Sequence, residues 1–429
     1  MSRTWVSESR ALSARRDRMF VRLRADFSAS AAIAGLIALV ATYSGPVLIV
    51  VQAAQAGHLS HSLLSTWIWA VSIGAGALGL WLSLRHKMPV LGAWSTPGVA
   101  LLITGLAHYP FSDVVGCYLV VSIIVAALGL SGLFTRLIQH LPAHLLSAMI
   151  AGVLFEFCAG IFRSLEAAPA VVLPVVVVYV VCRRVIARYA VALALLAGVI
   201  VALPGANLNM HGLDLRIVTP EMTLPGFSAA SLIGLGLPLL LLALTQYATS
   251  VHILRSAGYA ISPRSVVGAS GLMSIPLALF GNSGINPAAI VGAMCASPEC
   301  HENPQRRYIS GVVCGIGYLC IGAFGASVVA LFARLPEGLT TTLAGLALLG
   351  TLVTSLASAL ANEAHRESSV ITFVVTVSGM SFLGLGSALW GLVAGIAFSL
   401  VLAKRPFRRS AKQSNEAAAT VSAVQSERT

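Results

Sequence analysis

The chain has 429 residues, of which 57% are hydrophobic and only 10% are charged. An ordinary soluble domain carries about a quarter charged residues, so this composition excludes a soluble enzyme and a disordered chain. The apolar residues stand in continuous runs rather than in alternation, which excludes a transmembrane β-barrel and predicts an all-α polytopic membrane protein.

In chain order, a basic tail (residues 1–27) precedes about fourteen apolar segments, and a second basic tail (404–429), which we expect to be disordered, follows them. The third and tenth segments have only about 12 residues each, fewer than the ~20 that cross a bilayer as a helix. The predicted segments are residues 29–56, 64–84, 94–106, 112–134, 142–162, 169–182, 189–204, 231–254, 265–280, 286–297, 308–332, 338–361, 368–383 and 385–403.

The positive charges predict how these segments are oriented, because cytoplasmic loops carry most of the Lys and Arg residues of membrane proteins. With both termini in the cytoplasm, only Arg163, Arg216 and Arg334 of the 27 Lys and Arg residues fall outside. The net charge of +12 is therefore a topology signal, and we expect no nucleic-acid partner. The first apolar run is too long for a cleaved signal peptide, so we expect a multi-pass protein of a bacterial-type inner membrane.

Two short segments share a pattern, GAWSTPG at 92–98 and GNSGINP at 281–287. Proline is favoured at the first helical position and pushes the preceding residue to an extended form, so Pro97 and Pro287 predict half-helices preceded by short strands. Pro97 and Pro287 are 190 residues apart, and Pro46 and Pro238, in the long segments ahead of them, are 192 residues apart. We predict two repeats of seven segments, the second inverted in the membrane, although ordinary proline kinks are an alternative.

Two half-helices that begin near the midplane would direct their N-terminal N–H groups at one cavity, which favours an anion such as a carboxylate. No acidic residue lies between Asp26 and Asp113, or between Glu221 and Glu299. We predict a neutral, partly aromatic site for a flat aromatic or small apolar acid. The polar groups available to it are Tyr43, Ser44, Gln52, Trp94, Ser95, Thr96, Thr245, Gln246, Tyr247, Asn282, Ser283 and Asn286.

Structural roles stay open for several of these residues. Trp94 could be an interfacial anchor, and Ser95 and Thr96 could serve only to cap a helix. Gln52 and Gln246 could serve only to hydrogen-bond between helices.

Glu156 is an acidic residue inside a predicted span, which makes it the candidate for proton coupling. The alternative is a structural ion pair with Arg163, about two helical turns away. We expect no cofactor other than the coupling proton. We also expect no metal, because Cys295, Cys300 and His301 lack a second ligand pair.

The chain also carries the motifs LRSAGY (254–259), NPAAI (286–290), SPECH (297–301), RRY (306–308), LAGLALLGT (343–351) and FLGLGSALWGL (382–392). With these motifs the sequence resembles the benzoate/proton symporter (BenE) family over nearly its whole length.

The resemblance implies a proton-driven transporter of aromatic acids with the seven-plus-seven inverted-repeat fold of nucleobase and sulfate permeases. In that fold the substrate binds between the half-helices of segments 3 and 10, and a homodimer is one expected assembly. The implied parts are a core (28–136 and 231–335), a gate (137–205 and 336–403) and an extracytoplasmic loop (206–230).

Other functions stay open on the sequence alone. The same fold could carry a nucleobase, sulfate or another anion, or could form a channel. A membrane-embedded enzyme is disfavoured, because His58 and His61 lie in a predicted outside loop and no base stands near a nucleophile.

Overall fold

The computed structural model describes residues 25–43, 46–186, 189–202, 217–288, 290–298, 300–332, 336–383 and 385–402. Most of these residues are helical, as the sequence predicts. Nearly all of the two predicted tails and part of the predicted loop 206–230 lie outside the described residues, and so does Ser44 of the predicted site.

The first half of the chain forms helices of very different length, with one short strand among them. Its elements are α2 (Ala29–Tyr43), α3 (Pro46–Ala56), α4 (His61–His86), β1 (Gly92–Trp94), α5 (Thr96–Leu106), α6 (Phe111–Ser131), α7 (Phe134–Ile138), α8 (Ala143–Ala167), α9 (Pro169–Val185) and α10 (Ala190–Ala202).

The second half again places a short strand ahead of a short helix. Its elements are α11 (Ala229–Ser231), the π-helical turn η2 (Leu232–Gly236), α12 (Leu237–Ser256), α13 (Pro263–Ala278), β2 (Ile285–Pro287), α14 (Ile290–Ala296), η3 (Pro304–Arg306), α15 (Tyr308–Ala323), α16 (Gly325–Phe332), α17 (Glu337–Leu360), η4 (Glu363–His365), α18 (Arg366–Val377) and α19 (Ser387–Leu402).

Within the described residues, six helical stretches are long and apolar enough to cross a membrane. They are Ala29–Ala56, His61–His86, Phe111–Ser131, Ala143–Ala167, Ala229–Ser256 and Gly338–Leu360. Other apolar helices, such as α5, α10 and α19, are shorter. The chain is therefore built as a multi-pass membrane protein, and the count of fourteen segments stays a prediction.

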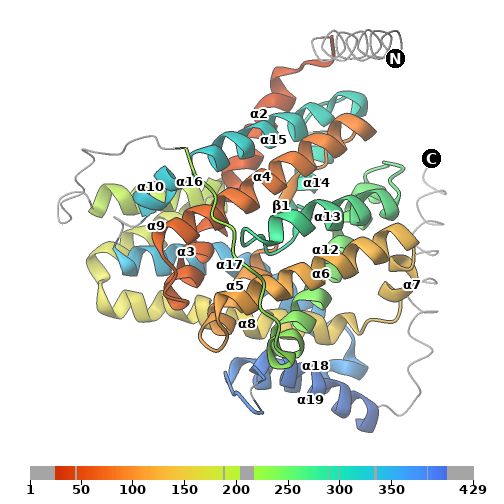
Figure 1. Cartoon of the computed structure of the whole chain (residues 1–429). Coiled ribbons are helices and arrows are strands. Elements are labelled where there is room, and N and C mark those ends of the chain that lie inside the picture. Colours follow the sequence, from red (N-terminus) through yellow and green to blue (C-terminus); the bar gives the residue numbers. More distant parts are fainter. Residues whose placement is uncertain are drawn as a thin grey trace.

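The helices pack in two groups, each of which draws on both halves of the chain (Figure 1). In one group, α4 packs against α15 and α6 packs against α13. In the other, α8 packs against α17 and α18, and α18 packs against α19. Small residues allow the backbones to approach closely: a Cβ at Gly129 of α6 would collide with the backbone of Gly268 in α13.

The described part of the long loop ahead of α11 runs extended across helices of the first group (Figure 1). Val218 N–H donates to the carbonyl of Ala323 (3.1 Å), and Thr223 N–H donates to that of Leu279 (2.8 Å). Gly226 N–H donates to the carbonyl of Ser112 (2.9 Å). The loop therefore ties α15, α13 and α6 together at one end of this group.

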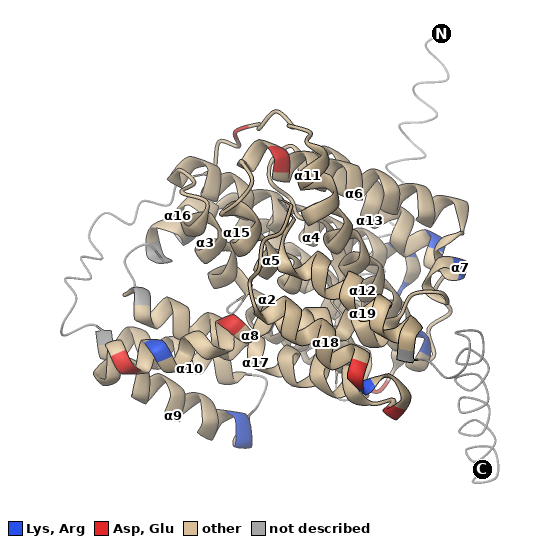
Figure 2. Ribbon diagram, turned by 90° about the horizontal axis from the view of Figure 1, so that it is seen from below, with Lys and Arg blue, Asp and Glu red and all other residues tan. Residues whose placement is uncertain are grey.

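Charged residues lie mostly at the helix ends (Figure 2). One cluster joins the residues ahead of α2 to the end of α4 and the start of α15. Lys87 Nζ donates to Asp26 Oδ2 (3.1 Å) and to the Tyr308 hydroxyl (2.6 Å), which itself donates to Asp26 Oδ2 (2.8 Å). Burial raises the pKa of Asp26, but the hydrogen bonds from Tyr308 and Lys87 and the charge of Lys87 outweigh it, so this pKa lies below its ordinary value.

Candidate functional site

The two short strands form an antiparallel pair at the place where the two broken segments of the chain meet. Gly92 lies opposite Pro287, Ala93 opposite Asn286 and Trp94 opposite Ile285. The half-helix α5 follows β1 directly, and α14 begins three residues after β2. The pairing therefore brings the starts of two distant helices to one place.

The register explains how a proline fits into β2. Ala288 N–H donates to the carbonyl of Leu91 (2.7 Å), so Leu91 and Ala288 form a hydrogen-bonded pair. Because such pairs alternate along an antiparallel ladder, Pro287 falls at a non-hydrogen-bonded position, where its missing N–H removes no ladder bond. The prediction that Pro287 begins the half-helix is therefore wrong: it ends the strand, and α14 begins at Ile290.

The other edge of β2 is held by side chains from α12 and α13. The Tyr247 hydroxyl donates to the carbonyl of Ile285 and the Ser250 hydroxyl to that of Pro287, each at 2.6 Å. Ile285 N–H donates to Ser274 Oγ (3.1 Å). These backbone groups point away from β1, so without the side chains they would be buried and unpaired. Tyr247 is among the polar groups predicted for the site, but its role as an anchor of β2 was not predicted.

The strand β1 and the start of α5 are packed tightly. A Cβ at Gly92 would overlap the carbonyl oxygen of Ala75, so β1 lies directly against the backbone of α4. Ser95 caps α5, because its Oγ accepts a hydrogen bond from Gly98 N–H (3.0 Å). Thr96 is the first residue of the helix. The capping role considered for Ser95 is therefore confirmed, and a cap can still contact a ligand.

Three aromatic rings from three distant segments gather beside the strand pair. The Trp94 ring lies edge-on to Tyr43 (centroids 5.4 Å apart) and to Tyr318 of α15 (5.7 Å). The Tyr318 hydroxyl donates to Thr42 Oγ1 (2.8 Å), and the Tyr43 hydroxyl lies 3.4 Å from Ser72 Oγ. Sequence reasoning missed Tyr318, because nothing in its local sequence indicates that it meets Trp94.

Several buried polar atoms in and around the strand pair have no hydrogen-bond partner within the described residues. They are Trp94 Nε1, Gln246 Oε1, Asn282 Nδ2 and Ser283 Oγ. A buried polar group without a partner costs about 1–3 kcal/mol. All four belong to the set predicted from the sequence. Other unpartnered atoms, such as Tyr118 Oη and Ser399 Oγ, lie elsewhere among the described residues.

The remaining predicted residues lie around this centre. Asn286 is buried in β2. Thr245 donates to its own helix at the carbonyl of Leu242 (2.7 Å). Gln52 is partly exposed on α3, which packs against α5.

Glu156 lies on α8, outside the strand pair. Its Oε1 accepts a hydrogen bond from Arg163 Nη1 (2.7 Å), and both side chains are more than half exposed. The ion pair considered as an alternative is therefore present.

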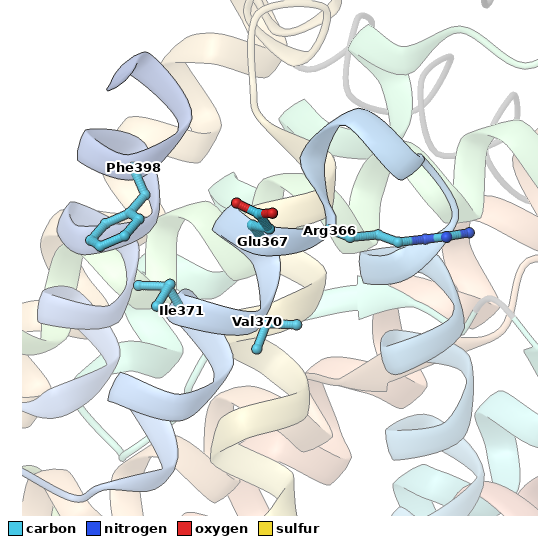
Figure 3. A pocket seen from close by; sticks show the side chains of 5 residues that line it. All are labelled: Arg366, Glu367, Val370, Ile371 and Phe398. Atoms are coloured by element: carbon cyan, nitrogen blue, oxygen red, sulfur yellow. The ribbon is translucent and has the colours of Figure 1, made fainter. Parts of the chain in front are cut away.

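A separate hollow of about 330 Å³ lies between α18 and α19 (Figure 3). It is lined by Arg366, Glu367, Val370, Ile371 and Phe398, and none of these residues belongs to the strand pair or its neighbours. Arg366 pairs with Glu363 (3.0 Å) and points away from Phe398. Within the described residues, no group of three or more His, Cys, Asp or Glu side chains could hold a metal ion.

Comparison with known proteins places the chain in a family. Residues 25–401 match the family described as benzoate membrane transport protein (BenE). The chain belongs to this family. Its relatives include the benzoate membrane transport protein of Acinetobacter baylyi, 38% identical over 383 residues, which are 89% of this chain and 97% of that protein. The inner membrane protein YdcO of Escherichia coli is 35% identical over 371 residues, which are 86% of this chain and 95% of that protein.

The resemblance to the BenE family is thereby confirmed, and solved structures show the fold of this BenE-family chain. The transmembrane domain of the cyanobacterial bicarbonate transporter BicA aligns with a TM-score of 0.56 at 14% identity, covering 86% of this chain and 97% of that one. The murine anion transporter Slc26a9, in its inward-facing state, aligns with a TM-score of 0.56 at 13% identity, covering 88% and 68%. At such low identity the likeness concerns the fold alone.

Proposed function

We propose that this BenE-family protein is a proton-coupled secondary transporter that imports benzoate or a related aromatic carboxylate by alternating access. The observation that carries the proposal is the β1–β2 pair, which brings two broken membrane segments together beside three aromatic rings and four unpartnered polar atoms. Interrupted segments in corresponding positions of two repeats are typical of the binding sites of secondary transporters.

The chemistry of this centre suits an aromatic carboxylate. The indole N–H of Trp94 and the amide of Asn282 are donors without a protein partner, and the start of α5 adds a partial positive charge. No Asp or Glu occurs in the two broken segments. The edge-on packing of Tyr43 and Tyr318 around Trp94 provides aromatic surface for a flat ring.

The two groups of helices supply the moving parts of the proposed mechanism. We assign residues 28–136 and 231–335 to a core that carries the site, and residues 137–205 and 336–403 to a gate. The packing of α4 with α15 and of α8 with α17 supports this division. Movement of the core against the gate would expose the site to either side of the membrane in turn.

The same fold could carry a small inorganic anion, as the bicarbonate transporter among the structural neighbours does. The ring cluster of Tyr43, Trp94 and Tyr318 favours an aromatic acid instead. We also propose an inner-membrane location with both termini in the cytoplasm, and a homodimer as the assembly.

Uptake of labelled benzoate into proteoliposomes with an imposed inward proton gradient tests the proposal. We expect accumulation that collapses when a protonophore removes the gradient. Uptake that does not depend on the proton gradient would refute proton coupling. If an excess of unlabelled benzoate neither binds nor competes, benzoate is not the substrate. A panel that includes uracil and sulfate identifies another cargo.

Glu156 is the proposed proton-coupling residue, and its ion pair with Arg163 gives a competing structural role. Glu156→Gln separates the two roles when gradient-driven accumulation and gradient-free exchange of benzoate are both measured. A coupling residue is needed for accumulation but not for exchange. Wild-type accumulation by this variant would reduce Glu156 to a structural partner.

A further inference from the structure

Most glycines inside the helices of this protein sit where there is no room for a side chain. A Cβ at Gly271 of α13 would collide with the backbone of Ala126, and a Cβ at Gly98 of α5 would lie 2.7 Å from Ser95 Oγ. Protein interiors are close-packed, so such contacts are expected wherever helices approach through small residues.

Gly292, in the half-helix α14, is different. It is buried, yet apart from its chain neighbours and the backbone of its own helix, no heavy atom of the described residues lies within 4 Å of the position that its Cβ would take. Because Gly292 is itself buried, this space lies inside the protein and not on its outer surface. Gly284, just ahead of β2, also has open space at the corresponding position. Gly284 is only partly buried, so of these two positions Gly292 alone shows open space inside the protein.

The elements around α14 are those that carry the candidate site. α14 packs against α2, which ends at Tyr43, and against α12, which carries Gln246 with its buried, unpartnered Oε1. The helix that carries Gly292 thus packs against two helices that hold predicted ligand contacts. Empty space inside a close-packed protein reduces stability, so its presence here calls for a functional reason.

We propose that this methyl-sized space at Gly292 faces the transported aromatic acid and receives a substituent of its ring, so that the absence of a side chain at this position determines which ring substituents are accepted. This inference rests on the proposed function. It adds a specificity-determining residue that the sequence patterns did not indicate, because a glycine carries no recognisable ligand chemistry.

The test of this proposal compares a methyl group added to the ligand with a methyl group added to the protein at position 292. In the wild type, the open space would accept benzoate and at least one of the ortho, meta and para methylbenzoates. In Gly292→Ala, the new methyl group would occupy the space that the ligand's methyl group needs. We expect the selectivity for benzoate over the best-bound methylbenzoate to rise about tenfold, the usual scale for one misplaced methyl group in a packed pocket.

The measurement is inhibition of labelled benzoate uptake by benzoate and by each methylbenzoate, in proteoliposomes of the full chain. Gly386→Ala is the matched control, because a Cβ at Gly386, ahead of α19, also meets no described atom within 4 Å and this residue lies outside the site. Thermal melting in detergent checks the packing. Gly292→Ala should melt no lower than the wild type, whereas Gly271→Ala should melt several degrees lower.

The outcomes are distinct. A wild type that does not bind benzoate refutes the proposed function and this inference with it. If the wild type binds benzoate, equal selectivity in Gly292→Ala and Gly386→Ala overturns this inference alone. So does a wild type that rejects every methylbenzoate, or a drop in melting temperature of Gly292→Ala as large as that of Gly271→Ala.

Discussion

Removing the hydroxyl of Tyr247 should loosen the strand β2 without disturbing its surroundings. Tyr247 is 2% exposed, and its hydroxyl donates a 2.6 Å hydrogen bond to the Ile285 carbonyl. Tyr247→Phe keeps the ring and its edge-on contact with Phe134 (centroids 6.4 Å apart), so the hydrogen bond is what the substitution removes. The Ile285 carbonyl is then left buried with no donor from α12.

Leaving one buried acceptor unpaired costs about 1–3 kcal/mol. A loss of 1 kcal/mol lowers the melting temperature by about 2–4 °C in a domain of 150–250 residues and by less in a longer chain, so we expect a drop of about 2–5 °C here. Since membrane proteins commonly unfold irreversibly, the wild type and the variant are to be heated at the same rate. The assay is thermal melting in detergent, followed by tryptophan fluorescence.

Tyr259→Phe is the matched control, because the Tyr259 hydroxyl donates a longer, exposed hydrogen bond of 3.2 Å to the Pro304 carbonyl. Its melting temperature should stay within about 1 °C of the wild type, as for most surface substitutions. If Tyr247→Phe is as stable as Tyr259→Phe, the Tyr247 hydroxyl does not hold β2 and the reasoning fails.

Three further outcomes are expected. Gly92→Ala should lower the melting temperature by several degrees, because its Cβ would overlap a backbone carbonyl of α4; melting like the wild type would show that β1 and α4 can separate freely. Asp26→Asn should lower the melting temperature at pH 7, because the lowered pKa of Asp26 stabilises the folded protein above the unfolded-state pKa. This stabilisation is lost as the pH falls through the native pKa, so the difference in melting temperature from the wild type should shrink in acid. A difference that does not depend on pH would contradict the charged contacts with Lys87 and Tyr308. Trp94→Phe should weaken benzoate binding about tenfold through loss of a donor to a charged group, and the smaller buried ring should also lower the melting temperature; unaltered affinity would show that the indole N–H does not bind the carboxylate.

Several helices follow closely from the hydropathy of the chain. The predicted segments 112–134 and 338–361 correspond to α6 (Phe111–Ser131) and α17 (Glu337–Leu360) within a few residues. The segments GAWSTPG and GNSGINP also predicted short strands and short helices, and β1 with α5 and β2 with α14 lie at those places. Such features depend on neighbouring residues, because apolar runs, proline and glycine act through the local backbone.

Other features could not be predicted from neighbouring residues in the sequence. Pro287 lies in a strand and not in the first turn of a helix, because its place in the ladder is set by Leu91, far away in the chain. Tyr318 joins the ring cluster, and Tyr247 anchors β2, through contacts that no pattern in their own segments predicts.

Composition and charge placement were enough to define a polytopic helical protein with two interrupted segments and no acidic residue inside them. Which side chains meet at the interruptions, which polar atoms are left without partners and where the interior is open at Gly292 depended on how the helices pack. The physical reason is that backbone preference acts over a few residues, whereas burial and open space are properties of atoms brought together from distant parts of the chain.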